Sequence, residues 1–85
     1  MNVPRFTFLP RWKEELVCSS PLGSLVLEMP MGVESVYLPT EAAWRDRAPG
    51  WAREHWQEIH TQLQEWCARN KIPLYVEDTA QVYQA

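Results

Sequence analysis

The sequence predicts a small α+β fold in which an antiparallel sheet packs against one long helix in the C-terminal half. Residues 5–38 contain short apolar runs separated by proline and glycine, and residues 41–70 carry apolar residues at helical spacing. A further strand-like run follows at residues 74–78. We expect a sheet of three to five strands that starts as a meander, in the order β-β-β-β-α-α-β, within a single domain spanning residues 1–85.

Two short strands are expected near the N-terminus, over residues 5–9 and 15–19. The first alternates between apolar and polar residues and ends at Pro10, which cannot donate to a strand ladder. Pro21 and Gly23 then predict a turn, because proline presets φ and glycine tolerates a positive φ. The second strand should therefore lead directly into a third.

Two more strands are expected over residues 24–29 and 33–38. In the first of these, Leu25, Leu27 and Met29 share one face, because side chains alternate along a strand. Short connections between successive strands favour antiparallel pairing, so the first four strands should form a meander.

Helical sequence begins after Thr40, which is a suitable N-cap for a short helix over residues 41–46. Pro49 interrupts this helix, because a proline removes a backbone hydrogen bond and clashes with the preceding turn. A long helix should then start with Pro49 in its first turn. Asn70 is the expected left-handed C-cap, and Pro73 prevents the helix from resuming.

The long helix should present an apolar stripe, roughly 100° wide, to the sheet. This stripe consists of Ala52, Trp56, Ile59, Leu63, Trp66 and Cys67. We assign Trp56 and Trp66 to the core on this basis. After the last strand, residues 79–83 should form a turn followed by a packed end.

Composition and charge exclude several classes of protein. The net charge is −3 and no block of basic residues is present, which argues against binding to nucleic acid. No run is long and apolar enough to predict a membrane segment, and the N-terminus lacks the apolar region of a secretory signal. Two cysteines are too few for a disulfide framework, so we predict a cytoplasmic protein with reduced thiols.

No catalytic, metal or cofactor motif stands out. His55 and His60 are five residues apart, which places them on opposite flanks of the helical stripe, whereas metal-binding helices use the i, i+4 spacing. Cys67 is expected at a helix C-terminus, where the helix dipole opposes a thiolate. We therefore predict no catalytic residue, no metal site and no cofactor, and an enzyme that uses a histidine is the weakest alternative.

The remaining signal is a surplus of aromatic residues away from the stripe. Trp51 lies off the stripe, Trp44 precedes the interruption at Pro49, and Trp12 is expected in a loop. These residues and Tyr37 either pack together where the short helix folds over the sheet edge or form an exposed patch that binds a partner. The candidate binding residues are Trp12, Trp44, Arg47, Trp51 and His55.

The first functional hypothesis is a small, non-catalytic interaction or regulatory module of bacterial type, which binds a protein partner or a second copy of itself. The alternative is a small-molecule site between the helix and the sheet. Aromatic residues would line that site, and His55 or His60 would supply a polar anchor.

Overall fold

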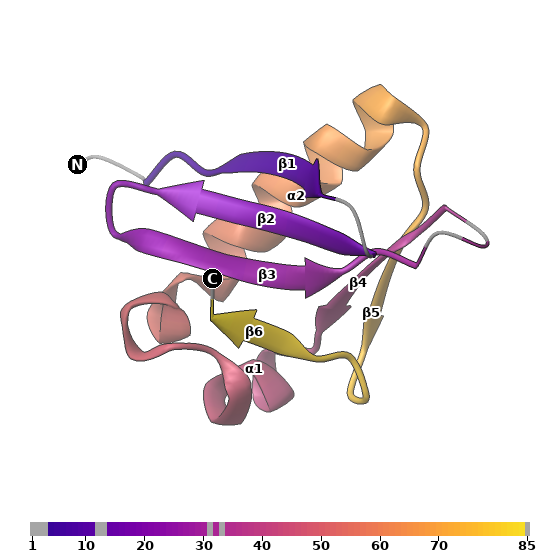
Figure 1. Cartoon of the computed structure of the whole chain (residues 1–85). Coiled ribbons are helices and arrows are strands. Elements are labelled where there is room, and N and C mark those ends of the chain that lie inside the picture. The colour runs from indigo at the N-terminus through magenta and orange to yellow at the C-terminus, as the bar shows by residue number, and fades with distance from the viewer. Residues whose placement is uncertain (1–3, 12–13, 31, 33, 85) are drawn as a thin grey trace.

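The computed structural model describes residues 4–11, 14–30, 32 and 34–84. Within these residues the chain forms one sheet with helices on one of its faces (Figure 1). The elements are β1 (Thr7–Arg11), β2 (Glu15–Ser20), β3 (Gly23–Glu28), β4 (Val36–Pro39), α1 (Glu41–Arg47), the 3-10 helix η1 (Gly50–His55), α2 (Trp56–Asn70), β5 (Leu74–Glu77) and β6 (Val82–Gln84). The predicted α+β fold with a helix in the C-terminal half is therefore confirmed.

The first three strands form the predicted antiparallel meander, β1–β2–β3. The other edge of β3 has two partners. Glu28 at its end pairs with Tyr37 of β4, and residues 25–27 pair with β6. The packed end expected after residue 79 is thus a sixth strand, which lies against the middle of the sheet.

The expectation of a purely antiparallel sheet is wrong for one pair of strands. β4 and β5 are parallel, in a register that runs from Val36–Leu74 to Pro39–Glu77. The chain between them consists of α1, η1 and α2. A helical crossover of this length carries the chain back to the end of the sheet at which β4 began, so the next strand runs parallel to β4.

The interruption at Pro49 has a larger effect than predicted. Thr40 caps α1 as expected, since its Oγ1 accepts a hydrogen bond from the Ala43 N–H at 3.3 Å. After Pro49, however, the chain forms the 3-10 helix η1, and the α-helical geometry begins only at Trp56. The long helix is therefore shorter at its N-terminus than the sequence predicts.

The C-terminus of α2 differs from the prediction by one residue. The left-handed residue is Lys71, with φ of 57°, and its N–H bonds back to the carbonyl of Ala68. Asn70 instead donates from its Nδ2 to the carbonyl oxygen of Trp66 at 2.8 Å. Both residues thus satisfy carbonyl groups that the last helical turn leaves unpaired.

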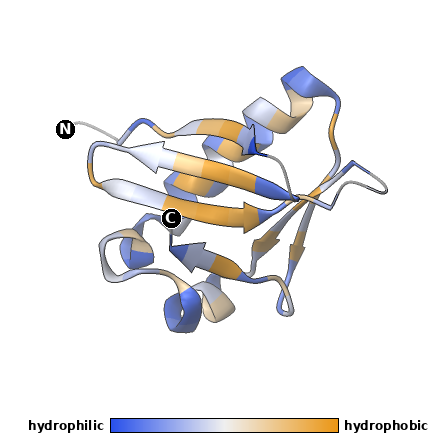
Figure 2. Ribbon diagram, viewed as in Figure 1, coloured by the Kyte–Doolittle hydropathy of each residue, from blue (hydrophilic) through white to orange (hydrophobic). Residues whose placement is uncertain are grey.

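The core lies between the sheet and the helices. Figure 2 shows apolar residues concentrated in the middle of β2 and β3 and along β4. The strands contribute to the core the fully buried residues Leu16, Cys18, Leu25, Leu27, Val36 and Leu38. The helical segments contribute Trp44, Ala52, Ile59 and Leu63. Among the described helices, none combines the length and apolarity that crossing a membrane requires.

The assignment of tryptophans to the core needs a correction. Trp44 is the fully buried one, and its Nε1 donates to the carbonyl oxygen of Ala52 at 2.9 Å. Trp56 and Trp66 only pack against the core and remain half-buried. Trp56 is the first residue of α2, and its indole Nε1 donates to the carbonyl oxygen of Pro39, at the end of β4, at 2.8 Å.

Candidate functional site

Of the predicted binding residues that the structure describes, Trp44 is buried, while Arg47, Trp51 and His55 each contact other parts of the chain. Trp12 lies outside the described residues. Trp44 is 0% exposed and has no surface to offer a partner. Arg47 is exposed, but its Nη1 donates to the carbonyl oxygens of Asp78 and Ala80, so it holds the turn between β5 and β6.

Trp51 and His55 both lie on η1; Trp51 packs against the first residue of β3, and His55 packs against Phe6, which precedes β1. The indole of Trp51 covers Gly23 so closely that a Cβ at Gly23 would lie 2.7 Å from Trp51 Cε2. The ring of His55 lies 6.5 Å from the ring of Phe6, and its Nδ1 is 2.9 Å from Glu58 Oε1. Both side chains keep part of their surface exposed, so a contact role for them stays a prediction.

The groups considered for catalysis are separated. His60 stacks on Trp56 with ring centroids 4.6 Å apart, while His55 contacts Glu58 within one turn of helix. Burial raises the pKa of the Cys18 thiol to about 12 and that of Cys67 to about 11, so both thiols are protonated at neutral pH. In the described part of the chain, no three His, Cys, Asp or Glu side chains converge as metal ligands would.

The face of the sheet opposite α2 carries an apolar row that was not predicted from the sequence. Strand register places Leu9, Val17, Val26 and Tyr83 side by side on β1, β2, β3 and β6. Leu9 is 67% exposed and Tyr83 is 51% exposed. Val26 is only 2% exposed, yet it is not part of the core under α2. We call this row the open-face row.

Two polar rows flank the open-face row on the same face. The row toward the β2–β3 turn contains hydroxyl groups, from Thr7, Ser19 and Ser24. The row on the other side contains Arg11, Glu15, Glu28, Tyr37 and Tyr75. In Figure 1 this face of β1, β2 and β3 points toward the viewer, with α2 behind the strands.

The flanking row that contains Arg11, Glu15, Glu28, Tyr37 and Tyr75 is held in place by local contacts. Arg11 donates from Nε to Glu15 Oε1 at 2.8 Å, and Glu28 Oε1 accepts the N–H of Gln81 at 2.8 Å. Tyr37 and Tyr75 stack with ring centroids 5.4 Å apart. Alternation alone places Val26 and Tyr37 on the face away from the core, but only the strand register shows that Leu9 and Tyr83 join them.

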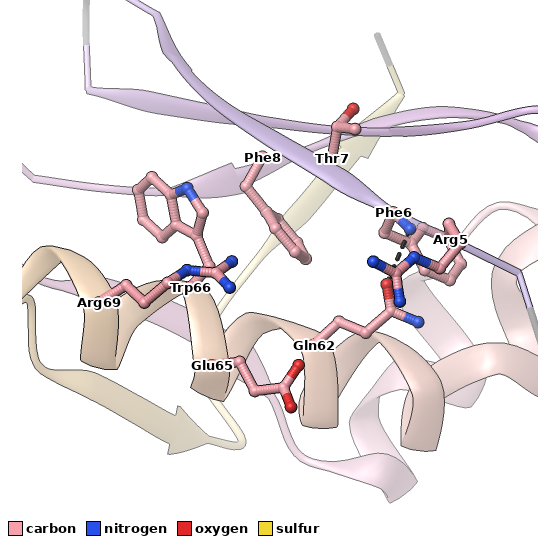
Figure 3. Close-up of a pocket in the computed structure, with 8 residues that line it drawn as sticks. All are labelled: Arg5, Phe6, Thr7, Phe8, Gln62, Glu65, Trp66 and Arg69. Atoms are coloured by element: carbon pink, nitrogen blue, oxygen red, sulfur yellow. Dashed lines mark hydrogen bonds between the residues drawn. The ribbon is translucent and has the colours of Figure 1, made fainter.

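A groove of about 290 Å³ lies between the edge of β1 and α2 (Figure 3). Its apolar walls are formed by Phe8 of β1, by Phe6, which precedes β1, and by Trp66 of α2. Arg5, Glu65 and Arg69 supply its charges. We call it the β1–α2 groove. His55 and His60, the polar anchors expected for such a site, are not among its lining residues.

Comparison with known proteins does not assign either surface. The chain matches no protein-family model, no curated protein and no solved structure. A function for this protein therefore has to be inferred from the geometry of the open sheet face and of the β1–α2 groove.

Proposed function

We propose that this protein is a non-catalytic interaction module that associates with a second copy of itself through the open sheet face. The open-face row is the observation that carries the proposal. Of the five large hydrophobic residues that are exposed in the described part of the chain, Leu9, Tyr75 and Tyr83 lie on this one face. Apolar side chains that are contiguous and rimmed by polar groups are typical of protein interfaces.

The arrangement of the three rows favours a second copy as the partner. A two-fold axis along the open-face row would place Leu9 opposite Leu9 of the second copy, and likewise Val17 opposite Val17 and Tyr83 opposite Tyr83. The same axis would set Ser19 and Ser24 of one copy over Glu15 and Glu28 of the other. Hydroxyl donors would then meet carboxylate acceptors, and like charges would not face each other.

The size of the face supports a weak association. Four strands at a spacing of about 4.8 Å, each with about five residues at 3.4 Å, cover roughly 300–400 Å² per copy. Specific protein interfaces usually bury about 800 Å² per partner. The association should therefore depend on concentration and be weaker than that of an obligate dimer.

A reduced, cytoplasmic environment belongs to the same proposal. It is supported by the two cysteines, Cys18 and Cys67, which are both free and buried in the core. A secreted protein of this size usually depends on disulfides for its stability.

The test compares two leucine substitutions of the same kind. Leu9→Glu introduces a charge into the open-face row, while Leu22→Glu introduces it in the turn between β2 and β3, where the side chain is 50% exposed. Sedimentation equilibrium over a hundredfold concentration range should show a monomer–dimer equilibrium for the wild type and for Leu22→Glu, and a monomer for Leu9→Glu. A monomeric wild type throughout, or equal association of both variants, would contradict the proposal.

A further inference from the structure

The outer edge of β1 is closed to a docking strand at two points. Pro10 has no N–H, so Pro10 and Leu16 form a pair without hydrogen bonds between the two residues. The backbone N and C=O of Pro10 therefore face the outer edge, where the proline offers no donor to another strand. Toward the N-terminus, Gln62 occupies the edge, since its Oε1 accepts from the Phe6 N–H at 2.8 Å and its Nε2 donates to the Pro4 carbonyl at 2.7 Å. These two closures protect the edge from pairing with another chain.

Between the closures, one residue offers its backbone to the β1–α2 groove. Pairs in an antiparallel ladder alternate in type, so the Phe8–Cys18 pair is of the same type as Pro10–Leu16. The N–H and C=O of Phe8 therefore point away from β2, on the side where the groove lies. One donor and one acceptor suit a small molecule better than an added strand.

The walls of the groove suit an apolar body. The rings of Phe8 and Trp66 lie 6.1 Å apart and are tilted by 47°, so they form two sides of a wedge (Figure 3). The volume of about 290 Å³ is at the lower end of the range for small-molecule pockets, which is about 300–1,000 Å³. A single ring or a branched aliphatic chain has the appropriate size.

The charge of the groove is opposite in sign to that of the whole chain. Arg5 and Arg69 supply two guanidinium groups and Glu65 one carboxylate, whereas the chain carries a net charge of −3. In the described structure ion pairs form at Arg11–Glu15 and His55–Glu58, and neither groove arginine takes part in one. Arg69 is three residues beyond Trp66, which places both side chains on the same face of α2. Guanidinium groups bind carboxylates with two parallel hydrogen bonds.

We propose that the β1–α2 groove binds a small apolar carboxylate. The apolar body of the ligand packs against Phe8 and Trp66, and its carboxylate pairs with Arg69, while Arg5 closes the other end of the groove (Figure 3). This site lies on the helix side of β1 and is separate from the open-face row, so it goes beyond the interaction function proposed above.

The experiment is an NMR titration of the ¹⁵N-labelled protein with phenylacetate and with its uncharged analogue phenylacetamide. Phenylacetate should shift the backbone amide of Phe8 and the indole N–H of Trp66, which Trp66→Phe identifies. Because the two arginines are exposed, we expect a Kd of roughly millimolar order, and the amide should bind about two- to fivefold more weakly. Equal affinity for the acid and the amide, or shifts that map elsewhere, would overturn the proposal.

Two variants separate the specific contact from a general effect of charge. Arg69→Gln should abolish the preference for the acid, whereas Arg53→Gln, which removes an exposed arginine from a different groove, should leave it unchanged. Retained acid preference in Arg69→Gln would contradict the assigned contact, and well-dispersed spectra of both variants would show that they are folded. A dipeptide with a free C-terminal phenylalanine that binds more than tenfold tighter than phenylacetate would overturn the assignment to a small acid in favour of a peptide terminus.

Discussion

Trp51 and Gly23 fit together so closely that no larger residue has room beneath the indole. The ring of Trp51 covers the backbone at the start of β3, and a Cβ at Gly23 would lie 2.7–3.2 Å from three atoms of that ring. This contact joins η1 to the β2–β3 turn. It also explains the place of Trp51 off the predicted stripe, because this indole packs over the start of β3 at the margin of the core.

Gly23→Ala should destabilise the protein by about 1–3 kcal/mol, because either Trp51 or the turn must move. Gly50→Ala is the matched control, since a Cβ at Gly50 has no atom within 4 Å. Urea unfolding followed by tryptophan fluorescence measures both. Equal stability of the two variants would show that the contact between Trp51 and Gly23 can relax without cost.

The two cysteines should be unreactive in the native protein. Their raised pKa values keep them protonated, and burial hides them from reagents, so modification by Ellman's reagent at pH 8 should require unfolding. Rapid modification of either thiol under native conditions would contradict their placement in the core.

The raised pKa of Cys18 also predicts a dependence of stability on pH. The unfolded thiol ionises near the ordinary cysteine pKa of 9.0, while the folded thiol stays protonated up to about 12. The unfolded state therefore binds fewer protons above pH 9, and the stability contributed by the protonated thiol is lost as pH rises from about 9 to 12. In urea unfolding at pH 8 and pH 10, Cys18→Val should lose less stability than the wild type, and an equal loss would contradict this.

At the scale of elements, α1 and the β5–β6 turn are held together by a small set of polar contacts. Arg47 donates to the carbonyl oxygens of Asp78 and Ala80, and the Thr40 hydroxyl donates to an Asp78 carboxylate oxygen. The backbone N–H of Thr40 also donates to the carbonyl oxygen of Glu77. These contacts position the turn so that β6 reaches β3 and presents Tyr83 on the open sheet face.

Arg47→Gln should loosen β6 with little effect on the rest of the molecule. The loss of two hydrogen bonds to carbonyl groups should cost about 1–3 kcal/mol. Hydrogen exchange should accelerate at the amides of Val82–Gln84 more than at those of β2. Arg45→Gln removes another exposed arginine of α1 and should leave hydrogen exchange in β6 unchanged. Equal exchange rates in the two variants would show that the contacts of Arg47 do not hold β6 in place.

The elements were predictable where local signals decide them, and not where distant contacts do. Alternation predicts β1–β3, and Thr40 predicts the start of α1. β1 nevertheless continues through Pro10, the residue expected to end it, to Arg11, because an edge strand tolerates a proline whose missing N–H faces away from its neighbour. The parallel pairing of β4 with β5 depends on the path of the helices, which no local pattern shows. The tail after residue 79 has too few residues for a clear strand pattern, and β6 forms because the free edge of β3 is available for pairing.

The candidate site was less predictable than the fold. Helical periodicity assigns tryptophans to the core by their angle around the axis of the long helix. Trp44 lies on a different helix, α1, and reaches the core from there, so this periodicity does not apply to it. The open-face row joins β1, β2, β3 and β6, and the β1–α2 groove joins residues 5–8 to residues 62–69. Both combine segments that are distant in the sequence, and their assembly needs the strand register and the packing of α2.

At the scale of the whole molecule, helices cover one face of the sheet, and no described helix covers the other (Figure 1). These helices form the core with the face that they cover, while the opposite face carries an apolar row between two polar rows. Two copies stacked on this face would form a four-layer particle in which each sheet is covered on both sides. Self-association would complete a packing that one copy leaves open.

The most direct test of self-association through the open sheet face is a dilution series of ¹⁵N-labelled protein followed by NMR over a hundredfold range of concentration. We expect concentration-dependent shifts at the amides of the open-face row, Leu9, Val17, Val26 and Tyr83, and their absence in the Leu9→Glu variant. Spectra that do not change on dilution, or shifts that map to the surface of α2 instead, would contradict the central claim that the open sheet face is the contact surface.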